Sequence, residues 1–294
     1  MKVIIAGASS GIGAALTTAL AEDGHELFVC GRRADRLARL SDGCERIKSR
    51  SCDVSRPNDV EVFATWIRQH TDSIDVLVNC AGGFGAIGRM WETDAKEWTQ
   101  TIATNLFGTY YMIRAIVPLL KGGSRPRIIN MSGGGAFNPF PHYSAYAVSK
   151  AAVVRLTETL AEELAPLGVM VNGIAPGFVA TEIHDATLKA GARAGNEHLD
   201  KTKELLADGK SKVRIDVPVR CVKFLVSPSA DGLTGKTISA GFDPWDDKAF
   251  EDCIDALNES ELYTQRRVNL VHLADSKLKG ALEQASARRS DENG

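Results

Sequence analysis

The sequence predicts an α/β protein: one doubly wound parallel sheet of about seven strands, with helices on both faces and a C-terminal extension. Three observations predict this fold. Short apolar runs alternate with longer stretches of helical character, which is typical of parallel strands buried on both faces. The first run passes through a glycine-rich turn directly into a helical stretch. The alternation then continues to about Gly241, and no linker divides it.

The first half of the chain contains four predicted strands. Short apolar runs predict three of them at residues 2–6, 26–30 and 75–79, the first rich in β-branched side chains, and a weaker signal predicts the fourth at residues 46–52. Boundary residues mark the helices between them, because Gly24 follows the first helix and Pro57 precedes the third. These helices cover residues 14–23, 36–40 and 58–70.

The second half contains the two longest predicted helices and three further strands. The helices cover residues 97–120 and 145–164. The strands cover residues 127–131, 169–174 and 236–240. Residues 187–218 break the alternation, because they are polar and contain several glycines and lysines. We interpret them as an excursion over the edge of the sheet that carries the site.

Candidate functional residues follow the predicted strands. Gly7, Arg32, Asp53 and Ser132 come directly or almost directly after one, and Asn79 is the last residue of another. A doubly wound sheet binds its ligand beyond the carboxyl ends of its strands. The sequence therefore places the ligand site at that edge.

Composition excludes several classes of function. The net charge is −2 with both signs interspersed, so no basic stripe indicates nucleic-acid binding. No apolar run approaches the roughly 20 residues of a membrane span, so no membrane partner is expected.

The six cysteines are scattered without a CxxC pair, which indicates reduced thiols in a cytoplasmic protein. Residues 1–7 are too short for a signal peptide. No metal site is expected, because His184 and His198 are isolated and are interpreted as surface histidines.

A glycine loop, Gly7-x3-Gly11-x-Gly13, lies between the first strand and the first helix. Gly11 and Gly13 would let the backbone approach a pyrophosphate, and the helix N-terminus would offer free N–H groups to the phosphates. The spacing differs from the GxGxxG dinucleotide fingerprint. A tight turn without a ligand is therefore the alternative, although the position at the first strand-to-helix junction favours a cofactor.

Tyr146 and Lys150 lie four residues apart on a predicted helix and so share one face. A free tyrosine has a pKa near 10. A lysine cation one turn away would lower the pKa of Tyr146, which could then exchange a proton with a carbonyl or hydroxyl oxygen. The alternative is an ordinary surface pair on an amphipathic helix.

Taken together, these motifs resemble the short-chain dehydrogenase/reductase family in its short form of about one Rossmann domain. The matching residues are the glycine loop, Asp53-Val54, Asn79-Cys80-Ala81-Gly82, Asn105, Ile128-Ile129-Asn130-Met131, Tyr146-x3-Lys150 and Pro176-Gly177 with Thr181. They occur in the family's order from Met1 to about Gly241.

The resemblance implies a role for each motif. Tyr146 would be the acid/base, Lys150 would also bind the nicotinamide ribose, and Asn105 would hold a water in a proton relay. Asp53 and Val54 would flank the adenine, while Pro176 to Thr181 would hold the carboxamide. The remaining cofactor-binding residues implied are Gly7, Ser9, Ser10, Gly11, Ile12, Gly13, Arg32, Arg33, Asn79, Ala81, Gly82, Gly177 and Val179.

The sequence departs from the family pattern in three places. Ala6 stands where threonine is usual before the first glycine, and the chain continues past Gly241 where the family usually ends. The family's spacing from Tyr146 places the catalytic serine at Gly133, one residue after Ser132. Either no hydroxyl comes from this loop, or a one-residue shift among three consecutive glycines brings Ser132 to Tyr146. We favour the shift narrowly.

The end of the second strand favours NADP as cofactor, with NAD as the alternative. An acidic residue there normally binds the ribose 2′-hydroxyl of NAD. The sequence instead has Gly31 followed by Arg32 and Arg33, and a guanidinium pairs well with a 2′-phosphate. We expect Arg32 to face the adenosine 2′ position, so that NADPH binds more tightly than NADH.

The implied function is an oxidoreductase that transfers a hydride between NADP(H) and a carbonyl or secondary alcohol. Two other functions remain open: a non-catalytic nicotinamide-binding sensor or scaffold, and a sugar-nucleotide epimerase or dehydratase that shares YxxxK. The substrate is not specified. Aromatic and histidine side chains that could line its pocket are Phe84, Phe137, Phe140, His142, Tyr143 and Phe178.

Two expectations concern organisation. Residues 1–241 would form the cofactor-binding domain and residues 242–294 an extension. The extension would be ordered and helical to about residue 274 and would pack near the substrate cleft or a subunit interface. Its last ~20 residues would be disordered. The two long helices would pair between subunits, giving a homodimer or homotetramer. The second of them has apolar residues on more than one face.

Overall fold

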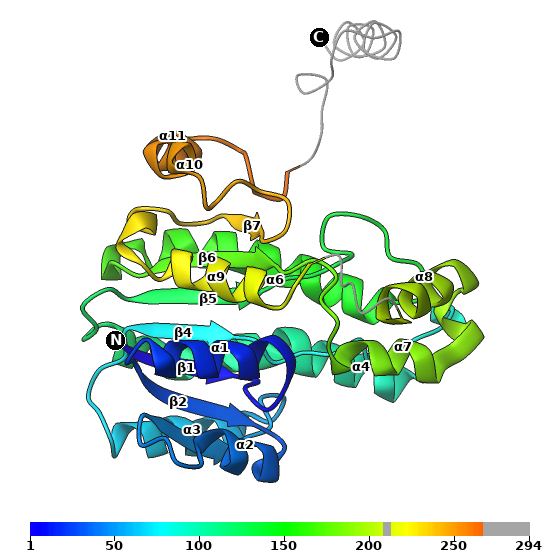
Figure 1. The fold of residues 1–294 in the computed structure, drawn as a ribbon, viewed down its shortest axis with the longest axis horizontal. Helices are drawn as coiled ribbons and strands as arrows, with labels where there is room; N and C mark the ends of the chain where they lie inside the picture. The colour runs from blue at the N-terminus through cyan, green and yellow to red at the C-terminus, as the bar shows by residue number, and fades with distance from the viewer. Residues whose placement is uncertain (208–212, 267–294) are drawn as a thin grey trace, which may run out of the picture. The chain divides into compact units, whose positions relative to one another are not determined.

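A computed structural model describes residues 1–207 and 213–266 of the chain. Within these residues one sheet contains seven strands, all parallel, in the order β3-β2-β1-β4-β5-β6-β7 (Figure 1). The strands are β1 Lys2–Ala6, β2 Glu26–Gly31, β3 Ile47–Ser51, β4 Val76–Asn79, β5 Arg127–Met131, β6 Met170–Ala175 and β7 Thr237–Ser239. The predicted fold class is confirmed, and each strand lies within two residues of its predicted limits.

The predicted helices of the first half are also present. They are α1 Gly11–Glu22, α2 Ala34–Ser41 and α3 Pro57–Arg68. The later helices are α4 Ala95–Ile102, α5 Gly108–Leu120, α6 Ser144–Glu163, α7 Asp185–Ala190, α8 Asn196–Ala207, α9 Asp216–Leu225, α10 Lys248–Asp252 and α11 Ile254–Glu259. None of the described helices is both long and apolar enough to cross a membrane.

Alternation of side chains along the strands builds a core on each face of the sheet. Val3 and Ile5 of β1 belong to one core cluster, together with apolar side chains of α1, α2 and α9. Ile4 and Ala6 belong to the other, together with side chains of α3, α5 and α6. Successive residues of a strand point to opposite faces, so a continuous apolar run fills both cores.

The helix predicted at residues 97–120 is interrupted. A π-helical turn, Ala103–Phe107, joins α4 to α5. A π-turn inserts one extra residue into a helix and frequently occurs at functional sites. Its third residue is Asn105, whose amide is thereby turned into the interior, with only 1% of the residue exposed.

The polar excursion predicted at residues 187–218 is largely helical. It contains most of α7, all of α8 and the start of α9, while residues 208–212 lie outside the described part of the chain. Figure 1 shows α7 and α8 at the end of the molecule toward which the strand arrows point. The excursion therefore reaches the edge of the sheet where the ligand site was expected.

The C-terminal segment packs on the sheet domain. Met1–Thr264 form one compact unit. Trp245 and Phe250 are buried in the core cluster on the α9 face, with their rings 5.9 and 6.0 Å from that of Phe224. Further on, the Tyr263 carbonyl accepts a hydrogen bond of 2.8 Å from the Thr237 amide of β7. The described part of the extension thus contains helices, as expected, while its place near the cleft or a subunit interface stays a prediction and the rest of the tail lies outside the described residues.

The domain boundary at residue 241 stays a prediction. The core described above includes side chains from both sides of it. All six cysteines are free, and Cys30, Cys52 and Cys221 are buried, as expected for thiols with a packing role.

Candidate active site

A cavity of about 1200 Å³ opens at the carboxyl edge of the sheet. It exceeds the usual size of a small-ligand pocket, so it has room for a dinucleotide and a substrate. Every predicted site residue except Asn79 contributes to its wall. These are Gly7, Ser9, Ser10, Gly11, Ile12, Gly13, Arg32, Arg33, Asp53, Val54, Ala81, Gly82, Asn105, Ser132, Tyr146, Lys150, Pro176, Gly177, Val179 and Thr181.

The glycine loop is as tight as the sequence suggested. A Cβ on Gly13 would lie 2.3 Å from the Gly7 carbonyl oxygen, so no larger residue fits between the helix and the turn. The loop leads into α1, whose first N–H groups have no partner within the helix and no side-chain cap, so they are available to an anion. This cradle fits the pyrophosphate of a nicotinamide dinucleotide.

Asn79 lies behind the cavity. Its Nδ2 donates to Asn130 Oδ1 at 2.9 Å, and Asn130 Nδ2 donates to Thr157 Oγ1 of α6 at 3.0 Å. This buried chain ties β4 to β5 and to the helix that carries Tyr146. Asn79 braces the sheet; a direct contact with the cofactor stays a prediction.

Asn105 is held from both ends by backbone and side-chain groups. Its Oδ1 accepts from the Gly83 amide at 3.0 Å, while Nδ2 donates to the Gly83 carbonyl and to Ser149 Oγ, both at 3.0 Å. A Cβ on Gly82 would lie 3.1 Å from Asn105 Oδ1 and 3.4 Å from Lys150 Nζ. The two polar groups therefore flank the same point of the cavity wall.

Tyr146 and Lys150 are both buried in α6, at 6% and 4% exposure. Lys150 Nζ donates to the Met131 carbonyl at 2.7 Å and lies 5.7 Å from the centre of the Tyr146 ring. The pair is therefore not the ordinary surface pair that was the alternative. Phe84 packs edge-on against the Tyr146 ring, with centroids 4.9 Å apart.

The predicted direction of the Tyr146 pKa was wrong. Burial raises the pKa of Tyr146 above its usual value. Burial also lowers the pKa of Lys150 to about 8. Desolvation penalises the charged form of each group, and burial is the main cause of both shifts in pKa. Tyr146 is thus protonated at neutral pH, in the state that can donate a proton.

Gly133, and not Ser132, lies beside the tyrosine hydroxyl. A Cβ built on Gly133 would be 2.1 Å from Tyr146 Oη, so the hydroxyl occupies the space that a side chain at this position would need. Ser132 is buried, and its Oγ has no hydrogen-bond partner among the described residues. The direct contact that a one-residue shift would give is therefore absent. A catalytic role for Ser132 stays a prediction.

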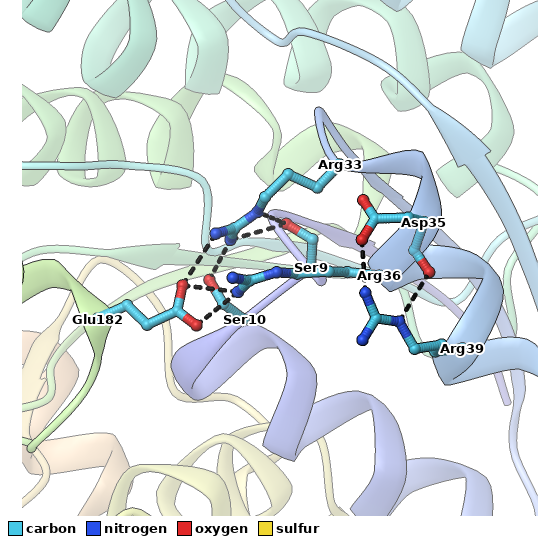
Figure 2. Close-up of polar contacts among 7 residues, drawn as sticks. All are labelled: Ser9, Ser10, Arg33, Asp35, Arg36, Arg39 and Glu182. Carbon is cyan, nitrogen blue, oxygen red and sulfur yellow. Dashed lines mark hydrogen bonds and ion pairs between the residues drawn. The ribbon is translucent and has the colours of Figure 1, made fainter.

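At the adenosine end, Arg33 contacts the serines of the glycine loop, whereas the expectation that Arg32 faces the adenosine 2′ position stays a prediction. Its Nε and Nη2 donate to Ser9 Oγ at 3.2 and 3.1 Å, and Nη2 also donates to Ser10 Oγ at 2.5 Å. Figure 2 shows this guanidinium against the start of the glycine loop. Arg32 is exposed and contributes to the cavity wall.

Sequence reasoning missed two charged residues at this end. Glu182, directly after Thr181, forms ion pairs with Arg33 and Arg36 (Figure 2). The only signal in the sequence was a carboxylate next to a predicted cofactor-binding threonine. Its partners are about 150 residues away, and no local pattern connects them.

The far end of the cavity is aromatic. Phe84, Phe140 and Phe178 line it, as expected, together with His184 and His198. The interpretation of His184 as a surface residue was wrong, whereas His198 is half-buried. His184 is 5% exposed and stacks on Phe178 with centroids 3.9 Å apart, and His198 packs edge-on against Phe140 at 4.9 Å. Their isolation in the sequence carried no signal of burial, yet both contribute to the wall of the cavity.

The other candidates for the substrate pocket lie elsewhere. Phe137 is 48% exposed, and Tyr143 is fully buried with its hydroxyl 2.9 Å from Thr187 Oγ1. No group of three or more histidine, cysteine or acidic residues suited to a metal occurs in the described residues.

Comparison with known proteins identifies a family and individual relatives that this chain resembles. The sequence pattern of the short chain dehydrogenase family matches residues 1–191. Human dehydrogenase/reductase SDR family member 4 is 30% identical over 247 residues, which cover 81% of this chain and 85% of the human protein.

Two solved structures share the fold. An actinorhodin polyketide ketoreductase with NADPH superposes with a TM-score of 0.73 at 25% identity, covering 82% of this chain and 97% of that one. The ligand-free aldohexose dehydrogenase of Thermoplasma acidophilum superposes with a TM-score of 0.70 at 27% identity, covering 82% and 92%.

Proposed function

Because this chain belongs to the short-chain dehydrogenase/reductase family and is an NAD(P)-dependent oxidoreductase, we propose that it transfers a hydride between NADP(H) and a carbonyl or secondary alcohol. The observation that carries the proposal is the buried pair Tyr146 and Lys150, which opens on the same cavity as the glycine loop.

Tyr146 is the proton donor to the carbonyl oxygen in reduction and accepts the proton from the alcohol in oxidation. Its raised pKa keeps the hydroxyl protonated until an acceptor is in place. The nicotinamide, when bound, supplies or accepts the hydride. Lys150, held by the Met131 carbonyl, places an ammonium beside the tyrosine and orients the ribose.

Asn105 is the next polar group inward from Lys150. Its amide is fixed by Gly83 and Ser149, so it presents a rigid group next to the lysine. We assign it to holding a water through which the lysine exchanges its proton with solvent. A π-turn suits this role because it directs one side chain inward without ending the helix.

NADP is the proposed cofactor at the adenosine end. Arg33 is aligned by two serine hydroxyls, and the neighbouring position Gly31 carries no carboxylate that would repel a 2′-phosphate. The ketoreductase that shares the fold binds NADPH. NAD is the alternative.

The substrate is a small molecule with an apolar or aromatic body next to its reacting group. Phe84 lies against Tyr146, and Phe140, Phe178 and His184 extend the wall beyond it. The names of the similar structures, a ketoreductase and an aldohexose dehydrogenase, support carbonyl and alcohol chemistry.

A nicotinamide-binding protein without turnover is the second candidate. Gly133 favours it, because the hydroxyl that usually polarises the carbonyl is missing beside Tyr146. The intact Tyr146, Lys150 and Asn105 favour the enzyme.

The test is oxidation of NADPH with a panel of aldehydes and ketones, followed at 340 nm. Turnover is expected with at least one apolar ketone, and Tyr146→Phe should reduce it by about a hundredfold or more while leaving the Kd of NADPH unchanged. Tight NADPH binding without turnover on any carbonyl or alcohol would favour the second candidate. Equal turnover by Tyr146→Phe would exclude Tyr146 as the acid.

Assembly through the long helices remains part of the proposal. Phe107, the last residue of the π-turn, and Tyr110 of α5 are 44% and 45% exposed, and Val148 of α6 is 52% exposed. Exposed apolar residues on these helices support a homodimer or homotetramer. Light scattering at micromolar concentration should give two or four times the mass of one chain.

A further inference from the structure

The carboxylate of Glu182 forms ion pairs with Arg33 and Arg36 at the adenosine end of the cavity (Figure 2). Glu182 Oε2 lies 2.9 Å from Arg33 Nη1, and Arg36 Nη1 lies 2.5 and 2.7 Å from Glu182 Oε1 and Oε2. Both carboxylate oxygens are therefore in use. Hydrogen bonds from Arg36 and Arg33 hold the pKa of Glu182 below its usual value, so the group is charged at neutral pH.

The position of Arg33 is fixed independently of Glu182. Its Nε and Nη2 are directed to Ser9 and Ser10, which leaves the Nη1 side of the guanidinium as the part available to an anion. Glu182 takes that side.

The same groups form a site for a phosphate. Two guanidiniums and two serine hydroxyls converge at the end of β2, and a Cβ on Gly31 would lie 3.1 Å from Ser9 Oγ. Guanidinium and hydroxyl donors in this arrangement suit phosphate oxygens. In the proposed function, the 2′-phosphate of NADP is recognised here.

We propose that Glu182 is an internal competitor for the adenosine 2′-phosphate and thereby sets how strongly the protein prefers NADPH over NADH. The inference rests on the proposed cofactor role. A phosphate and a carboxylate cannot share the same guanidinium donors without repulsion, so the phosphate must displace Glu182. NADH has no 2′-phosphate and leaves the ion pairs intact.

The competition is modest because the pairs are exposed. The side chains of Arg33, Arg36 and Glu182 are 41%, 37% and 47% exposed. Exposed ion pairs are weak, so the expected change in affinity is about fivefold. Glu182 therefore moderates the preference for NADPH without abolishing it.

The test is Glu182→Gln, which keeps the length of the side chain and removes its charge. The Kd values of NADPH and NADH are measured by calorimetry at low salt for the unmodified protein and the variant. The Kd of NADPH is expected to fall about fivefold, and that of NADH to change by less than about twofold.

Asp185→Asn is the matched control. Asp185 is exposed three residues further on, and among the described contacts its carboxylate is bonded to neither arginine. The control removes the same charge from the same segment and should leave both Kd values within about twofold. An equal effect of the two variants would mean that only net charge matters and would overturn the inference.

Other outcomes separate this inference from the proposed function. If NADPH binds the unmodified protein and Glu182→Gln leaves the ratio of the two Kd values unchanged, or weakens NADPH, the competitor role is wrong and the cofactor role stands. If the unmodified protein binds neither cofactor, the proposed function fails and this inference fails with it. Adenosine 2′,5′-bisphosphate should repeat the NADPH result without the nicotinamide.

Discussion

The two ends of the cavity use charge in opposite ways. At the adenosine end, Arg33, Arg36 and Glu182 are partly exposed and pair with one another. At the reacting end, Tyr146 and Lys150 are buried, and burial shifts both pKa values toward the uncharged forms. The exposed ion pairs at the adenosine end can be broken and replaced at a small cost in free energy, which suits selection between cofactors. Changing the charge of the buried pair at the reacting end costs much more, which suits controlled proton transfer.

The first prediction addresses the cost of burying Lys150. Its pKa is lowered from 10.5 to about 8. Below about pH 8 the amine is charged in the folded and unfolded states, and burial destabilises the fold. Between about 8 and 10.5 the unfolded state binds the extra proton, so the free energy of unfolding rises with pH, by up to about 3 kcal/mol.

Lys150→Met removes this dependence and supplies the control. Denaturant unfolding from pH 7.5 to 10.5 should show the unmodified protein gaining stability relative to the variant. Parallel curves for the two proteins would mean that Lys150 is not desolvated, and the contrast between the two ends would lose its main support.

The second prediction concerns the space around Tyr146. Gly133→Ala would place a methyl group 2.1 Å from the tyrosine hydroxyl, so the ring must move. We expect a loss of about 1–3 kcal/mol in the free energy of unfolding and a fall of at least about tenfold in kcat, with the Kd of NADPH unchanged.

Gly134→Ala is the matched control for this effect. A Cβ at Gly134 meets only Phe140 Cε1, at 3.9 Å. This variant should retain nearly full stability and turnover. If the two alanine variants behave alike, Gly133 does not constrain the tyrosine.

The third prediction separates the two neighbouring arginines at the adenosine end. Arg33→Ala removes a guanidinium aligned by Ser9 and Ser10 and should raise the Kd of NADPH about tenfold. Arg32→Ala should raise it by less than about threefold, because Arg32 is exposed. Fluorescence titration of both variants measures the difference, and the reverse order would move the phosphate site to Arg32.

The smallest effect is expected for Ser132→Ala. The Ser132 hydroxyl is buried and has no partner in the described residues, so its removal should change the free energy of unfolding by less than about 1 kcal/mol. The kcat should stay within about twofold. A fall of about a hundredfold would instead identify Ser132 as a donor to the developing oxyanion.

The strands and the cofactor loop could be predicted because their signals are local. An apolar run such as residues 3–6 fills both faces of a parallel sheet whatever surrounds it, and the four-residue spacing of Tyr146 and Lys150 fixes them on one helical face. The Glu182–Arg33 pair depends on two segments 149 residues apart, and no period or spacing records it.

Two other errors have a common physical origin. The sign of the Tyr146 pKa shift and the placement of His184 both depended on burial. How far a side chain at the rim of a cavity is buried depends on which segments, distant in the sequence, pack over it. The π-turn at Asn105 also escaped prediction, because the sequence around it has ordinary helical periodicity.

The backbone bond between Thr237 and Tyr263 has a consequence for solubility. Strand β7 forms one border of the sheet, and an unprotected border strand is a template on which another chain can add by hydrogen bonding. The returning C-terminal segment blocks part of that template at the Thr237 amide, while Trp245 and Phe250 hold the segment down. Loss of this cover would leave the Thr237 amide unpaired at the border, where another strand could add.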